Sequence, residues 1–248
     1  MPKTSESIDD YLKAILELAG PAGERATGSA LARHLGVSPA SVTGMLQKLS
    51  RRRPAWILYR KHYGARLTEE GRRRALRVVR RHRLLELFLC EVLGFPWDEV
   101  HEEAEQLEHF ISQKLEDRIA VKLGNPALDP HGQRIPRKDG TLADASAVCL
   151  DDLAPGERAV IASVFDREPR MLRDLASQGL TPGRKLAVLG RASAGGSITV
   201  RLEAKKGTRV LSPKLARAVL VERSNGSSNC GRPRVAPANP RRSKPRHS

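Results

Sequence analysis

Apolar residues recur at helical spacing in the first half of the chain and at strand-like spacing in the second half. Residues 7–20 read SIDDYLKAILELAG, with Ile8, Leu12 and Ile15 on one helical face and Gly20-Pro21 as a stop. From residue 148 the pattern changes to short β-like runs, RAVIASVF, KLAVLGRA and ITVRLE, separated by Pro-Gly and Gly-Gly. The change predicts a mainly α-helical protein that ends in a small β-barrel.

Residues 27–53 have the pattern of two short helices joined by a tight turn. In TGSALARHLGVSPASVTGMLQKLSRRR, Leu31 and Leu35 belong to the first helix, Gly36 forms the turn, and Ser38 and Pro39 begin the second. An ordinary helical hairpin would also fit. The next segment, WILYRKHYGARLT, is typical of a β-hairpin with a basic tip. A hairpin in this place favours a winged helix-turn-helix.

The second of these helices has small polar residues near its start and a basic residue further along. In a recognition helix, small polar side chains at the start contact base edges and later basic side chains contact phosphates. The candidate DNA-binding residues are Ser38, Pro39, Ser41, Thr43, Gln47 and Lys48 of the helix and Arg60 of the hairpin.

Two longer helical patterns follow the hairpin. The first is predicted to run from Thr68 to Gly94, and the second from Pro96 to Gly124. Residues 125–147, punctuated by proline and glycine, are expected to be ordered only where other residues hold them. The last stretch, residues 224–248, has six Arg or Lys and no acid, so we expect it to be disordered and cationic.

The segment VHEEAEQLEH, within the second long helix, carries an unusual set of side chains. An apolar stripe, which includes Val100, Leu107 and Ile111, is flanked by two histidines and two of the four glutamates. A solvated face is one explanation. A divalent cation is another, because it offsets the repulsion between carboxylates placed beside a buried surface.

Two further positions bear on this choice. His82 and Glu86 lie four residues apart on one face of the preceding helix. They could be metal ligands, or they could form a solvent-facing hydrogen-bonded pair. Asp10 could be a ligand, or it could form an S-x-x-D capping box with Ser7.

The net charge and the cysteines limit the classes of protein to which the chain could belong. A formal net charge of +16 predicts attraction to a polyanion, most simply nucleic acid, with an acidic membrane surface as the weaker alternative. Three isolated cysteines give no disulfide framework and no thiolate zinc site. Without a leader pattern or a membrane-length apolar run, the sequence favours a cytoplasmic protein.

The order of a winged helix-turn-helix, HRLLE, VHEEAEQLEH, DPHGQRIP and a terminal β-barrel resembles the diphtheria toxin repressor family of metal-dependent transcriptional repressors. The similarity covers roughly residues 5–223. It implies a DNA-binding domain (1–73), a helical metal-binding and dimerisation domain (74–124), a linker (125–147) and an SH3-like domain of the FeoA type (148–223) before the basic tail (224–248).

The resemblance also implies two metal sites. By position, the primary site would use Asp10, Glu105, Glu108 and His109. The ancillary site would use His82, Glu86, His101 and Glu168, although Met171 stands where the family has a glutamine. A competing ligand set for the ancillary site comprises Asp129, His131 and Asp166.

Acids at positions 10 and 105, where iron-responsive members have sulfur ligands, resemble the manganese-responsive branch, and oxygen donors suit Mn²⁺. Lys13 departs from some manganese members, which have a glutamate there, and this argues against a binuclear primary site.

The resulting hypothesis is a homodimeric repressor that Mn²⁺ activates, with Fe²⁺ or another divalent transition metal as alternatives. It would dimerise through the Val100, Leu107 and Ile111 stripe and bind a palindromic operator near genes for manganese or iron uptake. Two rival classes are a metal-independent winged-helix regulator and a di-metal carboxylate enzyme. The enzyme is disfavoured because neither metal-bearing helix contains the Glu-x-x-His motif of such bundles.

Overall fold

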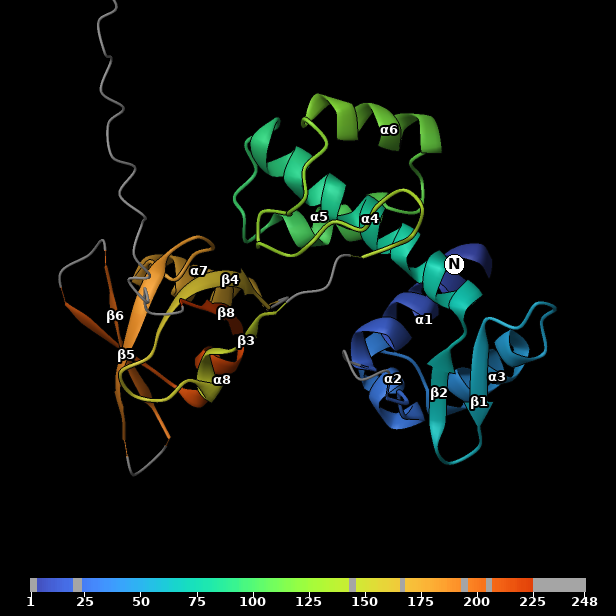
Figure 1. Cartoon of the computed structure of the whole chain (residues 1–248). Coiled ribbons are helices and arrows are strands. Elements are labelled where there is room, and N and C mark those ends of the chain that lie inside the picture. The colour runs from blue at the N-terminus through green and yellow to red at the C-terminus, as the bar shows by residue number, and fades with distance from the viewer. Residues whose placement is uncertain are drawn as a thin grey trace, which may run out of the picture.

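The computed structural model describes residues 4–19, 24–142, 146–165, 168–192, 196–203 and 207–224. Its first part contains α1 (Thr4–Leu18), α2 (Gly28–Leu35), α3 (Pro39–Ser50), β1 (Ile57–Arg60) and β2 (Gly64–Leu67). These elements form one group at the N-terminal end of the long helix α4 (Glu69–Glu91), as Figure 1 shows.

Local capping explains the boundaries of α2 and α3. The Thr27 side chain accepts a hydrogen bond from the backbone N–H of Ala30, and Gly36 ends α2 in a left-handed conformation. Ser38 caps α3 in the same way, with Pro39 in its first turn. The predicted helix-turn-helix is therefore confirmed.

The helix α1 begins before the predicted boundary. It starts at Thr4, so Ser7 lies inside the helix, and of the two alternatives for Asp10 the S-x-x-D capping box with Ser7 is wrong. The apolar face of α1, including Leu12 and Ile15, packs in one buried cluster with Leu31 of α2 and Leu46 of α3. The position of α1 is thereby tied by packing to that of α3.

The strands β1 and β2 pair antiparallel, with Ile57 opposite Leu67, and form the predicted wing. Gly64 at the start of β2 has a φ of 93°, and a Cβ there would lie 2.2 Å from the carbonyl oxygen of Ala26. Only glycine fits this close approach, which joins the wing to the segment before α2.

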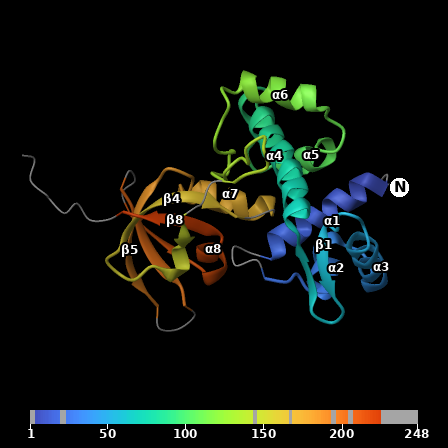
Figure 2. The ribbon, with the colours of Figure 1, turned by 45° about the vertical axis from the view of Figure 1, so that its right-hand side comes forward.

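The helix α4 connects the winged module to a second helical group (Figure 2). Its N-cap is Thr68, as predicted. The predicted single helix from Pro96 to Gly124 is instead two helices, α5 (Val100–Leu107) and α6 (Gln113–Lys122). The chain breaks between them because the Ser112 side chain accepts from the Leu115 N–H and starts a new helix.

This break changes the predicted dimerisation stripe. Val100 is fully buried and Ile111 is nearly so, and both pack in the core of their own helical group with Leu84 and Ile119. Neither Val100 nor Ile111 is available to a partner protomer in the way the sequence predicted. Of the predicted stripe, Leu107 remains exposed, and Phe110 lies next to it, 68% exposed.

The connector after α6 is held against α4. Arg80 and Arg83 of α4 donate hydrogen bonds to the carbonyl oxygens of Pro136 and Arg134. Gly132 has a φ of 80°, and a Cβ there would lie 2.1 Å from the carbonyl oxygen of Ala162. The expectation that this segment is ordered where other residues hold it is confirmed for its described part.

The C-terminal part is a six-stranded antiparallel sheet with two short helices. Its elements are β3 (Val148–Cys149), the 3-10 turn η1 (Leu150–Asp152), β4 (Arg158–Val164), α7 (Pro169–Gln178), β5 (Lys185–Arg191), β6 (Ile198–Leu202), β7 (Thr208–Leu211), α8 (Pro213–Arg217) and β8 (Val219–Arg223). The strand order is β3-β8-β4-β5-β6-β7. One apolar cluster joins the strands to α7 and α8, including Ile161, Leu175 and Val221.

The predicted three β runs are confirmed, whereas α7 was not predicted. The basic tail, apart from Ser224, lies outside the described residues. Among the helices that the structure describes, none combines the length and the apolar character that a membrane crossing requires.

Candidate metal centre and DNA-binding surface

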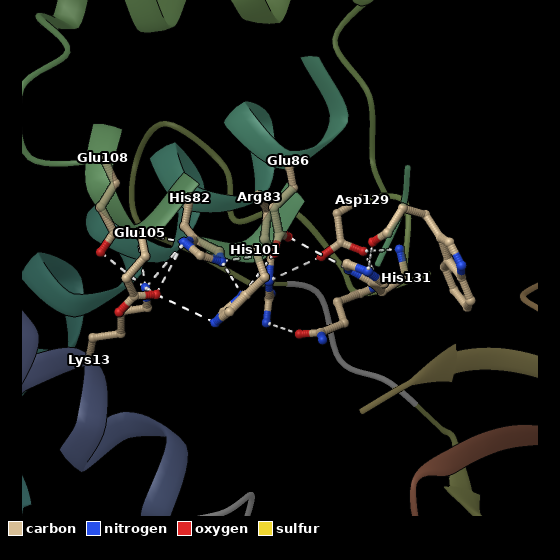
Figure 3. Close-up of polar contacts among 11 residues, drawn as sticks. Lys13, His82, Arg83, Glu86, His101, Glu105, Glu108, Asp129 and His131 are labelled. Atoms are coloured by element: carbon tan, nitrogen blue, oxygen red, sulfur yellow. Dashed lines mark hydrogen bonds and ion pairs between the residues drawn. The ribbon is translucent and has the colours of Figure 1, made fainter. Parts of the chain in front are cut away.

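Carboxylates and imidazoles form a continuous, largely buried line between α1 and the connector (Figure 3). Four overlapping groups within the described residues bring three potential ligand atoms within 4.8 Å of one another. The groups are Asp10, Glu108 and His109; His82, Glu105 and Glu108; His82, Glu86 and His101; and Glu86, Asp129 and His131.

The first group joins α1 to the end of α5. His109 Nε2 lies 2.8 Å from Asp10 Oδ1 and 3.5 Å from Glu108 Oε1. The hydrogen bond to Asp10 raises the pKa of His109. Asp10 is only half-buried, and a cavity of about 510 Å³ between α1, α2 and α5 has both Asp10 and His109 in its wall. An ion could reach this group from solvent.

Glu105 takes a different place from the other predicted primary ligands. Its carboxylate Oε2 lies 3.0 Å from Lys13 Nζ and 3.6 Å from His101 Nε2. Burial on its own raises the pKa of Glu105, but Lys13, His82 and His101 together outweigh burial and lower it. The structure therefore brings together three of the four predicted primary ligands and groups Glu105 with His82 and Glu108 instead.

His82 lies at the centre of the line and uses both ring nitrogens. Its Nδ1 is 2.6 Å from Glu108 Oε2, and its Nε2 is 2.9 Å from Glu86 Oε1. Burial alone would lower the pKa of His82, but the two carboxylates outweigh it, and the pKa is raised from 6.5 to about 9. In the metal-free protein His82 is thus a doubly protonated donor to two buried carboxylates.

The raised pKa of His82 predicts a pH dependence of the metal-free protein. The folded pKa exceeds the unfolded value, so this stabilisation is fully present below pH 6.5 and is lost as the pH rises toward 9. In urea unfolding with a chelator present, the unfolding free energy should fall across that window, and His82→Gln should lack this part of the fall. A His34→Gln control should keep it. Parallel profiles for the parent and His82→Gln would show that His82 is not the responsible group.

Glu86 connects the centre of the line to the connector. Its carboxylate contacts His82 and also His101 Nδ1, the latter at 3.1 Å. Burial alone would raise the pKa of Glu86, but these contacts outweigh burial and hold the pKa well below its usual range. On its other side lies His131 Nδ1, at 3.8 Å. His131 Nε2 donates to the Trp97 carbonyl oxygen at 2.8 Å, which leaves Nδ1 facing Glu86.

Asp129 completes this end of the line and has an unusual environment. Its Oδ1 accepts from the backbone N–H groups of His131 and Gln133, both at 2.9 Å. Its Oδ2 is buried and has no hydrogen-bond partner, with Arg83 Nε 3.6 Å away. Burial and the nearby Glu86 raise the pKa of Asp129 to about 6. A buried carboxylate oxygen without a partner is the feature that a cation would satisfy.

The remaining predicted ancillary ligands do not join these groups. Glu168 lies before α7, exposed, with its Oε2 2.9 Å from Lys214 Nζ. Met171 is buried in the apolar cluster of the C-terminal sheet. Asp166 lies outside the described residues. The groups therefore contain His82, Glu86 and His101 together with the alternative residues Asp129 and His131, but not Glu168.

The predicted DNA-binding residues share one property, which is exposure on the winged module. Ser38, Pro39, Ser41, Thr43, Gln47 and Lys48 are all exposed on α3, whereas Val42, Leu46 and Leu49 face its core. Arg60, at the end of β1, is exposed and its guanidinium lies 4.0 Å from the ring centre of Tyr63. Sequence reasoning did not include Arg51, Arg52 and Arg53, which continue the exposed basic surface beyond α3.

Three family models match the chain in order. They describe an iron-dependent repressor N-terminal DNA-binding domain (residues 3–53), an iron-dependent repressor metal-binding and dimerisation domain (68–137) and a FeoA domain (148–223). Together they account for the helix-turn-helix, the buried line of ligands and the C-terminal sheet.

Two of three relatives match over most of the chain, and the third matches just under half of it. The iron-dependent repressor IdeR of Mycobacterium tuberculosis is 28% identical over 90% of this chain and all of its own length. The regulator MntR of Bacillus subtilis is 37% identical over 47% of this chain and 79% of its own. A solved manganese-dependent transcriptional repressor in complex with manganese is 38% identical, with a TM-score of 0.82, over 88% of this chain and all of that one.

Proposed function

The chain belongs to the diphtheria toxin repressor family of metal-dependent, DNA-binding transcriptional repressors, and from this premise we propose that Mn²⁺ is the divalent ion that activates it. The observation that carries the proposal is the approach of Asp10 on α1 to His109 and Glu108 at the end of α5. The family consists of transcriptional repressors and not of enzymes.

The donor atoms of this group suit Mn²⁺. Asp10 and Glu108 supply carboxylate oxygens and His109 an imidazole nitrogen, and the described groups contain no sulfur. Oxygen-rich sites suit Mn²⁺, whereas thiolate and thioether favour softer metals. The solved relative named as a manganese-dependent repressor in complex with manganese supports the same choice.

Glu86, Asp129 and His131 are proposed as a second site, because Asp129 Oδ2, which is buried without a hydrogen-bond partner, would accept a cation there. This site uses the connector residues predicted as the alternative ligand set. Glu168, which pairs with Lys214, is not part of the proposal.

A cation at the first group would supply positive charge that holds Asp10 of α1 against Glu108 and His109. The consequence reaches DNA through packing, because α1 shares its apolar cluster with α2 and α3. Without the cation, α1 is joined to the end of α5 only by the Asp10–His109 hydrogen bond and the ion pairs of Lys13, so it is held less firmly. Metal binding and operator binding are then coupled, because both favour the same arrangement of the winged module.

The protein acts as a homodimer on double-stranded DNA. We propose that its operator is palindromic, with half-sites about one helical turn apart or a multiple of it, because two recognition helices related by a twofold axis read symmetric half-sites. Exposed Leu107 and Phe110 at the end of α5 are the proposed dimer contacts, in place of the buried Val100. The regulated genes are proposed to serve manganese or iron uptake.

The test is operator affinity measured with saturating Mn²⁺, Fe²⁺ or Zn²⁺ and with a chelator. The affinity of a protein site for divalent metal ions generally rises from Mn²⁺ toward Cu²⁺, whichever metal the protein uses in the cell. The informative quantity is therefore the gain in DNA affinity and not the affinity for the metal. We expect the largest gain with Mn²⁺ and none with the chelator. An equal gain with Zn²⁺ would contradict manganese activation, and no gain with any metal would favour the metal-independent regulator.

A further inference from the structure

Lys13 places a positive charge inside the buried line of ligands. The side chain extends from α1 between α4 and α5, and it is only 5% exposed (Figure 3). The Nζ atom lies 2.9 Å and 3.0 Å from the two carboxylate oxygens of Glu108. It also lies 3.0 Å from Glu105 Oε2 and 3.2 Å from His82 Nδ1.

The contacts with the two carboxylates are those of a coordinated cation. His82, Glu105 and Glu108 form one of the four groups whose ligand atoms lie within 4.8 Å of one another. The ammonium donates to the carboxylates of Glu105 and Glu108, and it lies beside His82 Nδ1, which itself pairs with Glu108. Burying an ammonium is strongly unfavourable unless its hydrogen bonds are satisfied by opposite charge. Glu105 and Glu108 provide this charge, so the position selects for a cation and already contains one.

We propose that the Lys13 ammonium is a tethered cation that takes the place of a metal ion among His82, Glu105 and Glu108. The inference rests on the proposed function in one respect: the activating metal binds at the neighbouring group of Asp10, Glu108 and His109. The group around Lys13 itself takes up no metal in this protein.

The tethered cation has a second consequence, because Lys13 belongs to α1. Its ion pairs with Glu105 and Glu108 join α1 to α5 when no metal is present. The metal-free protein is therefore partly arranged for DNA binding, and metal would strengthen the link through Asp10, which otherwise consists of the hydrogen bond with His109. Removing the charge at position 13 should enlarge the metal-dependent share of operator affinity.

A buried structural ion pair alone would also explain the Lys13 contacts. The two explanations differ in what removal of the charge produces. Loss of a structural ion pair only destabilises the fold, whereas loss of a tethered cation creates a metal position. The informative readout is thus the number and location of bound ions.

We would compare the parent with Lys13→Glu and with Lys138→Glu. Lys138 is a matched control because it is an exposed lysine that pairs with Asp117 on α6, outside the four groups. Bound Mn²⁺ is counted by equilibrium dialysis and located in crystals by anomalous scattering. Lys13→Glu should bind one more Mn²⁺ per protomer than the parent and the control, among His82, Glu105 and Glu108. A folded Lys13→Glu protein with the parent's count would overturn the proposal.

Two further arms apply if Lys13→Glu does not fold. Lys13→Met keeps the length of the side chain without its charge, and Mn²⁺ should raise its melting temperature more than that of the parent; an equal rise would overturn the proposal. Parent crystals with Mn²⁺ should show no manganese beside Lys13, and a manganese peak there would overturn it. A parent without manganese at Asp10, Glu108 and His109 contradicts the proposed function instead, and the comparison of variants still decides the role of Lys13.

Discussion

Replacement of His109 by alanine is expected to abolish the Mn²⁺-dependent gain in operator affinity. His109 contacts Asp10 across the junction of α5 and α1, so its loss removes a ligand from the group that joins the two helices. Coupling between two binding sites typically changes affinity about 5- to 150-fold, and this factor should fall to about one. Fluorescence anisotropy with labelled operator, with and without Mn²⁺, measures the change.

The His109→Ala protein should otherwise behave like the parent. The basic residues of the winged module are unchanged, so its sequence-independent affinity for DNA should persist. Glu102→Ala is the matched control, because Glu102 is exposed on α5, the helix that precedes His109, and lies in none of the four groups. A full Mn²⁺ response in His109→Ala would show that His109 is not a ligand.

Replacement of Glu108 by alanine should have the largest effect on stability. Glu108 is fully buried and accepts from Lys13 and His82, two buried groups that carry positive charge in the metal-free protein. Removing one partner of a buried ion pair leaves the other charges uncompensated and costs about 3–5 kcal/mol. Urea unfolding of the metal-free protein at neutral pH gives the value.

The Glu102→Ala variant again serves as the control, and its unfolding free energy should change by no more than about 0.5 kcal/mol. Glu108→Gln should fall between the two, because the amide oxygen still accepts a hydrogen bond while the charge is lost. A loss below about 1 kcal/mol in Glu108→Ala would mean that the ion pairs with Lys13 and His82 contribute little, and that burial of these groups is compensated elsewhere.

The sequence was most informative where local signals and periodicity agreed. Thr27, Gly36 and the Ser38-Pro39 pair mark the ends of α2 and α3, and capping chemistry acts within a few residues, so these boundaries follow from the sequence. The structure also brings together Asp10, Glu108 and His109, three of the four residues predicted for the primary site, because positions 108 and 109 are adjacent and Asp10 was assigned from the family resemblance.

The break between α5 and α6 could not be read from periodicity. The apolar spacing continues across it from Leu107 to Ile111, which favours one helix, whereas the Ser112 cap favours two. Glu108, the C-cap of α5, is fully buried, while the Glu105 side chain remains 43% exposed. The separation of Glu105 from the primary group, and the position of Lys13 between them, depend on this tertiary geometry and have no local signal.

The most direct test of the central claim is the Mn²⁺-dependent gain in operator affinity of Asp10→Ala. Asp10 is the member of the Asp10, Glu108 and His109 group that comes from α1, and Ser7 lies inside that helix, so the change removes no N-terminal cap. If metal controls DNA binding by joining α1 to α5, Asp10→Ala should remain a folded dimer with the parent's metal-free affinity and no gain from Mn²⁺. A gain equal to that of the parent would contradict the account.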